Sequence, residues 1–221
     1  MGLVSWRFPI LSMIVRSGWC VKKCSVRGGM MNEYAVIGFG AMTGIALSSA
    51  VGFRIFLPFL VAAIATKLGI LNVAPDFAWL GSWPALAVLS AASLSELVAY
   101  YIPVLDHALD VIGAPAAVVA GTLLTASMVV GMDDWLRWSL ALIAGGGVAG
   151  ALHTGMATIR GASTATTASI ANPVIATGEA VGATATAVSA LVLPVVVVVL
   201  AVIAIVVMGS FIMRRIGRKQ A

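Results

Sequence analysis

The chain has 221 residues, of which 61% are hydrophobic and only 10% are charged, and its mean hydropathy is +1.09. An ordinary soluble domain, in which about 25% of residues carry charge, is therefore excluded. Because so apolar a chain also contains 23 glycines and six tryptophans, we expect an all-α integral membrane protein with several closely packed transmembrane helices.

The 13 basic residues are concentrated at the two ends of the chain. Five precede Met31 and four lie in residues 214–221, whereas all eight acidic residues lie between. Topology and anionic lipid headgroups explain basic residues that flank apolar spans, so we expect the lipid bilayer, and no nucleic acid, as a partner. Cys20 and Cys24 lack the further ligands of a zinc site, and we expect no metal and no other cofactor.

Residues 1–30 form a basic extension that we expect to lie outside the fold. Its apolar stretch, residues 8–15, is too short to cross about 30 Å of hydrocarbon at 1.5 Å per residue, and it lacks a signal-peptide cleavage pattern. A cytoplasmic extension or a short interfacial helix fits it better, with Met31 as an alternative start. We expect the membrane domain at residues 31–213 and a basic cytoplasmic tail at 214–221.

Six apolar stretches predict six transmembrane helices. They cover residues 34–53, 55–66, 84–102, 116–132, 138–158 and 188–213. We expect a kink at Pro194 within the last of them. Since both ends are basic, the positive-inside rule predicts that both termini are cytoplasmic in a bacterial inner membrane. Lys67 and Arg137 would then face the cytoplasm, and Asp106 and Asp110 the outside.

Residues 161–187 are rich in Ala, Thr, Ser and Gly and only mildly apolar. They place many hydroxyl groups and Glu179 near membrane depth, with a break at Asn172–Pro173. Non-helical backbone at that depth is tolerated only inside protein or beside a water-filled cavity. The segment is therefore either a re-entrant or broken helix that lines a polar path, or a periplasmic loop that leads into the last span.

One internal alignment pairs residues 40–54 with residues 146–160. Gly40, Gly44 and Arg54 match Gly146, Gly150 and Arg160 at an offset of 106 positions. If it reflects a duplication, the two halves are parallel repeats, a recurring device in transporter folds, and the second and third spans are an inserted hairpin. Both G-x-x-x-G pairs predict close helix packing, since small residues let backbones approach each other.

Ionisable residues inside the membrane are the main candidates for function, because a charge at a helix centre costs about 2.5–3.5 kcal/mol. Arg54 and Arg160 either snorkel to the interface or neutralise buried acids. We expect Arg54 to pair with Glu96 or Asp106, and Arg160 to pair with Glu179. The candidate intramembrane or pore residues are Arg54, Glu96, Asp106, His107, Asp110, His153, Arg160 and Glu179.

The two histidines each allow two interpretations. Asp106, His107 and Asp110 could form a small cation site if the segment is helical, but three ligands are too few for a specific metal, and an exposed helix-entry turn is the simpler interpretation. His153 is either a proton-relay or pore residue or, as we prefer, a hydrogen-bonded core histidine. We expect no enzyme, because H-E-x-x-H, G-x-S-x-G and P-loop motifs are missing.

Two sequence blocks carry a family resemblance. G-F-R-x-F-L-P-F at residues 52–59 and E-x(6)-P-x-x-D-x-x-x-D at residues 96–110 resemble domain-of-unknown-function family 4126, small multispanning bacterial membrane proteins. The resemblance covers residues 34–213 and implies an inner-membrane protein without an assigned activity. We expect a transporter or channel for a small solute or ion. The rival is a non-transporting scaffold, or a homo-oligomer built on the G-x-x-x-G faces, whose buried charges are structural pairs.

Overall fold

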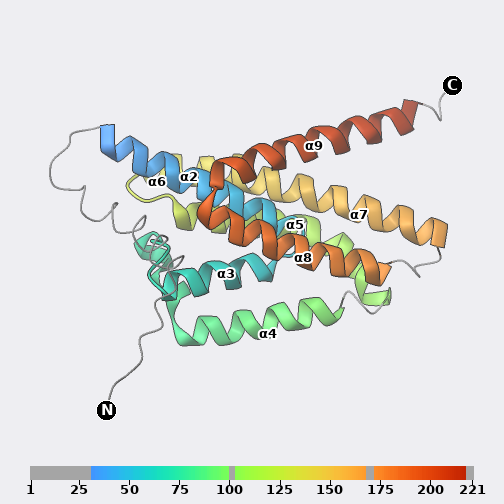
Figure 1. The fold of residues 1–221 in the computed structure, drawn as a ribbon, viewed down its shortest axis with the longest axis horizontal. Coiled ribbons are helices and arrows are strands. Elements are labelled where there is room, and N and C mark those ends of the chain that lie inside the picture. Colours follow the sequence, from blue (N-terminus) through green and yellow to red (C-terminus); the bar gives the residue numbers. More distant parts are fainter. Residues whose placement is uncertain (1–30, 100–102, 168–171, 218–221) are drawn as a thin grey trace, which may run out of the picture.

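The computed structural model describes residues 31–99, 103–167 and 172–217, and these residues form a bundle of helices (Figure 1). The predicted extension 1–30 and residues 218–221 of the tail lie outside the described residues. The elements are α2 (Met31–Val51), α3 (Phe56–Lys67), η2 (Pro75–Gly81), α4 (Trp83–Ala99), α5 (Pro103–Met128), α6 (Asp134–Leu140), the π-helical segment η3 (Ala141–Gly146), α7 (Gly147–Thr167), α8 (Asn172–Val192) and α9 (Pro194–Gly217).

The all-helical fold is as expected for the described residues, but six spans are not confirmed. Four helical stretches in the described part are long and apolar enough to cross a bilayer: residues 34–51, 134–167, 173–192 and 194–211. Elements η2 and α4, which meet at a bend of 69°, would make a fifth. Helix α3 and residues 112–128 of α5 are apolar but shorter. These apolar helices indicate a membrane protein.

Helix α5 lies at the centre of the bundle and packs against both α2 and α7. Glycines make this contact close: a Cβ atom on Gly44 of α2 would lie 2.9 Å from Thr125 Cα, and one on Gly121 would lie 2.8 Å from the Gly145 carbonyl oxygen. Gly40, Gly146 and Gly150 also meet α5. Both G-x-x-x-G pairs therefore face α5 and do not face each other.

The chain reverses between α2 and α3 inside the bundle. Pro58 explains the break, because in a continuous helix its ring would clash with the Arg54 carbonyl group, whereas in the first turn of a new helix its missing N–H costs nothing. Gly52 ends α2 nearby. The break places Arg54 in the interior, where it is 1% exposed. Because of this break, a loop that carries a charge, and not an apolar helix, reaches the bundle core.

Three predicted segments have different bounds in the structure. Residues 103–115, expected as an acidic connection, belong to α5, which continues through Pro115. Residues 161–167 extend α7, and residues 172–187 belong to α8, so the described parts of segment 161–187 are neither re-entrant nor a loop. The predicted span 188–213 is two helices, because the chain turns back at Leu193 and Pro194 (Figure 1). The sequence alone underestimated the length of the polar helices, which tertiary packing stabilises.

The two ends of the bundle differ in what they carry. Helix α3 ends, and α4 and α6 begin, at one end of the bundle (left in Figure 1). We call it the Arg137 end, because Arg137 lies in α6, with Lys67 at the end of α3 and Trp83 at the start of α4. Helix α7 finishes and α8 begins at the opposite end, which we call the Thr167 end. Helix α2 starts at the Arg137 end, and α9 finishes at the Thr167 end. If the bundle crosses the membrane along this axis, the start of α2 and the end of α9 lie on opposite sides, whereas the sequence prediction put both ends of the chain on one side.

Candidate functional site

Five ionisable side chains from four parts of the fold are buried in the half of the bundle nearer the Thr167 end. We call them the charge cluster: Arg54 from the α2–α3 break, Glu96 from α4, His153 and Arg160 from α7, and Glu179 from α8. Their exposed fractions are 1%, 7%, 1%, 1% and 2%, so the protein itself shields all five from the surroundings.

Glu179 joins both arginines. Arg160 Nη1 donates a short hydrogen bond to Glu179 Oε2, which confirms the predicted Arg160–Glu179 contact. Arg54 Nη2 lies 3.8 Å from the same oxygen and donates a 2.8 Å hydrogen bond to the Ala176 carbonyl on α8. The two arginines that align in the proposed repeat therefore converge on one carboxylate. The repeat itself stays a prediction.

Glu96 is buried as expected, but it does not form the predicted salt bridge with Arg54. Its Oε1 accepts a 2.7 Å hydrogen bond from the backbone N–H of Ile55, and its Oε2 accepts one of 3.0 Å from Phe56. These N–H groups open α3, where unpaired donors and the helix dipole favour a negative charge. Arg54 and Arg160 act on Glu96 only through longer-range electrostatic attraction.

His153 is a core residue, as we preferred from the sequence. The hydrogen bond that we expected for its ring is absent in the described part of the chain. Both ring nitrogens are buried without a hydrogen bond of normal distance and angle, although the Gly52 carbonyl group lies close to the ring. Gly113 of α5 leaves the space for the ring, since a Cβ atom there would collide with it. The histidine is therefore wedged between the α2–α3 break and α5.

The depth of the charge cluster follows from helix geometry. Arg160 lies seven residues before the end of α7, and Glu179 lies seven residues after the start of α8. At 1.5 Å per residue both are about 10 Å below the Thr167 end. The turns between them and that end carry hydroxyl groups at Thr164, Thr167 and Thr177. The hydroxyl groups of Thr167 and Thr177 donate hydrogen bonds to carbonyl groups one turn back in their own helices.

Asp106, His107 and Asp110 belong to the backbone of α5, and their side chains lie outside the described residues. The predicted Arg54–Asp106 pair and the cation site cannot be placed for that reason. Elsewhere in the described chain, no group of three or more His, Cys, Asp or Glu residues could hold a metal ion.

Arg137 is a buried charge whose partners the sequence did not predict. It is 7% exposed, and its Nη2 lies 2.9 Å from both Asp76 Oδ2 and Asp134 Oδ1. The i, i+3 spacing of Asp134 and Arg137 in one helix was a usable signal. The contact with Asp76 depends on η2 folding back against α6, which no local pattern indicates.

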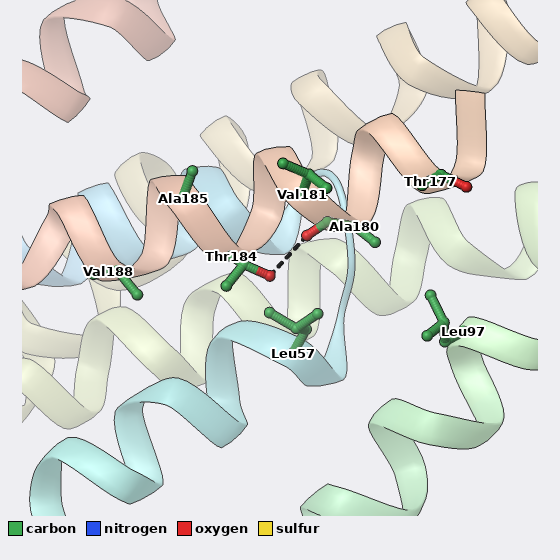
Figure 2. A pocket seen from close by; sticks show the side chains of 8 residues that line it. All are labelled: Leu57, Leu97, Thr177, Ala180, Val181, Thr184, Ala185 and Val188. Atoms are coloured by element: carbon green, nitrogen blue, oxygen red, sulfur yellow. Dashed lines mark hydrogen bonds between the residues drawn. The ribbon is translucent and has the colours of Figure 1, made fainter. Parts of the chain in front are cut away.

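An open groove of about 650 Å³ runs beside the charge cluster. Figure 2 shows its lining: Leu57 of α3, Leu97 of α4, and Thr177, Ala180, Val181, Thr184, Ala185 and Val188 along α8. Thr184 turns its hydroxyl group to the Ala180 carbonyl group, with a 2.8 Å hydrogen bond, so the wall of the groove is almost wholly apolar. The groove therefore lies between α4 and α8, the helices that carry Glu96 and Glu179, although neither carboxylate lines it.

The comparisons with known proteins identify the family and no more. The model of the family described as a domain of unknown function, DUF4126, matches residues 41–214, and the chain belongs to this family. No curated protein and no solved structure matches the chain.

Proposed function

We propose that this member of the DUF4126 family is a transporter or channel for a small solute or ion in the bacterial inner membrane, with Arg54, Arg160 and Glu179 of the charge cluster as its binding site. The convergence of Arg54 and Arg160 on Glu179 carries the proposal. Each charge is expensive to bury, and ionisable residues held in a membrane bundle are by default functional. A bundle that needed only stability could use apolar residues at all these positions.

The arrangement suits a site in which a solute replaces one protein contact of a charged side chain. Glu179 contacts two guanidinium groups, one from α7 and one from the α2–α3 break. A solute that competes for either contact would weaken the attachment of α8 to that element. Discontinuous helices with ionic groups at the break are the usual form of such sites in transporters.

The rival scaffold function needs glycine faces that can receive another chain. Gly40, Gly44, Gly146 and Gly150 already lie against α5 of the same chain. This observation favours transport over assembly through those faces.

Orientation is part of the proposal. Excluding the buried Arg54 and Arg160, seven basic residues precede or lie at the Arg137 end, namely the five before Met31 together with Lys67 and Arg137, against four in residues 214–221. The positive-inside rule therefore puts the Arg137 end in the cytoplasm. The charge cluster then lies nearer the outer face of the membrane.

Flux measurements in proteoliposomes test the proposal. Wild-type vesicles should exceed empty vesicles for at least one solute in a broad panel of ions and metabolites, and Glu179→Gln should reduce that flux at least about ten-fold, because it removes a charged partner in a low-dielectric site. Asp76→Asn is the matched control, since it removes an exposed carboxylate from a salt bridge at the Arg137 end. Equal leak from wild-type and empty vesicles across the panel would refute transport.

A further inference from the structure

Helix α4 is only weakly embedded in the bundle. Of its 17 residues, only Ala85 and Glu96 are buried, one near each end. It packs mainly against α3 and η2 and lies at the edge of the bundle in Figure 1. Its outer face exposes Val88, Leu94 and Val98, whose exposed fractions exceed 60%. The first half of α4 is held by Leu86 and Leu89, which pack against the core, and by Trp83, whose ring centroid lies 4.6 Å from Lys67 Nζ of α3.

The second half of α4 is held by a charged latch. Glu96 accepts both backbone N–H groups that open α3, and hydrogen bonds to an ionised acceptor are about twice as strong as neutral ones. No other described side chain of α4 forms a salt bridge or a hydrogen bond to another helix. The carboxylate of Glu96 therefore supplies most of the polar attachment of α4 to the bundle.

The opposite end of α4 has the geometry of a hinge. Elements η2 and α4 meet at a 69° bend around Gly81 and Ser82. The Ser82 hydroxyl group accepts a hydrogen bond from the Ala85 N–H at 3.3 Å, which caps the first turn of α4. On the other side of the bend, η2 is anchored by the buried residues Phe77 and Leu80 and by the Asp76–Arg137 salt bridge. Rotation at this bend would move α4 and leave η2 in place.

A rotation of α4 at this bend would open the groove. Leu97 of α4 lies across from Thr177 of α8, and Leu57 of α3 lies to the left of Leu97 (Figure 2). Withdrawal of α4 takes Leu97 from this wall and Glu96 from its buried position. The groove would then widen next to Arg54 and Glu179.

We propose that α4 is a lateral gate, hinged at Gly81–Ser82 and latched by Glu96 on the first N–H groups of α3, that controls access from the bilayer side to the charge cluster. The inference rests on the proposed function, because it assigns a regulatory element to the proposed site. Glu96 is accordingly a positioning residue and not a ligand of the solute.

Spin-label distances test the gate without any transport assay. Labels at Leu94→Cys on α4 and Val181→Cys on α8 are attached in a chain without Cys20 and Cys24 and measured in lipid nanodiscs. The wild type should give one main distance. Glu96→Ala, which loses both hydrogen bonds, should add a longer distance and raise its population about ten-fold or more over the wild type. Glu96→Gln keeps one acceptor atom and should give a smaller change, which keeps the test informative if the alanine variant does not fold.

Ser48→Ala is the matched control, since it breaks buried hydrogen bonds between α2 and α5, away from α4 and from the hinge. An unchanged distance distribution in both Glu96 variants would overturn the gate. The same broadening in Ser48→Ala would also overturn it, because the bundle would then be loosening as a whole.

A second measurement separates the gate from transport itself. A bifunctional maleimide between Leu97→Cys and Thr177→Cys should close the groove and abolish the flux that the unlinked protein supports. Full flux through the crosslinked protein would overturn the gate and leave the proposed transport intact. Opening of α4 in the Glu96 variants without flux in any variant would support the gate and refute transport.

Discussion

Arg160 and Glu179 form a salt bridge in the interior of the bundle, between the last turns of α7 and the first turns of α8. Each side chain is 1% exposed, so neither charge can be hydrated from outside the protein. The pair fastens two helices that would otherwise present Thr, Ser and Gly residues to each other. Because water cannot replace a lost partner, the contact should matter far more than a surface salt bridge.

Removing one member of this pair should strongly destabilise the protein. Arg160→Ala and Glu179→Ala each remove one charge of a buried contact, at a cost of up to about 3–5 kcal/mol. The double variant should lose less than the sum of the two single losses, because the direct contact between the two charges is lost only once. Thermal unfolding in detergent measures all three. Strict additivity would show that the two charges do not stabilise each other.

Arg54 should couple to Glu179 and much less to Glu96. Arg54 approaches Glu179 Oε2, whereas Glu96 bonds to the backbone of Ile55 and Phe56. A double-mutant cycle of Arg54→Ala with Glu179→Ala should therefore give a coupling energy within the range of about 0.5–3 kcal/mol for contacting residues, and the cycle with Glu96→Ala a smaller one. Equal coupling in both cycles would contradict this assignment. Detergent thermal stability is again the measurement.

Gly44→Ala should destabilise the bundle by about 1–3 kcal/mol, because the new methyl group would meet the Thr125 backbone and force α2 away from α5. Gly38→Ala on the same helix is the control, since nothing lies within 4 Å of its added Cβ atom. It should be neutral or slightly stabilising, as alanine favours helix more than glycine does. A loss in Gly38→Ala equal to that in Gly44→Ala would argue against the close contact.

The two ends of the bundle should be labelled from opposite sides of the membrane. Single cysteines at Ala78 and Asp133, near Asp76 and Asp134, should react with an impermeant maleimide only after cells are permeabilised. Cysteines at Ala165 on α7 and at Gln220 in the tail should react in intact cells. Labelling of Ala78 in intact cells would reverse the orientation. Protection of Gln220 in intact cells would place the tail on the same side as the Arg137 end and contradict the proposed orientation.

The sequence by itself determined the class of protein and the ionisable residues worth studying. Apolar stretches at 34–53, 55–66 and 84–102 coincide closely with α2, α3 and the described α4, because burial in lipid leaves a local and additive signal in hydropathy. The sequence also showed which charged residues lie within apolar segments, where a charge is costly. This argument selected Glu96, Arg160 and Glu179 as candidates.

Only the tertiary structure decided how these residues are joined. Glu96 bonds to backbone N–H groups, which have no sequence signature, and Arg54 reaches Glu179 across 125 positions of chain. Segment 161–187 looked too polar for an unbroken transmembrane helix, because its hydroxyl groups lower the hydropathy of the segment. In the structure, Thr166, Thr177 and Thr184 each bond to the carbonyl group one turn back in their own helix. Hydropathy averages over a window, whereas a hydrogen bond depends on where two particular groups meet, and the fold alone fixes that.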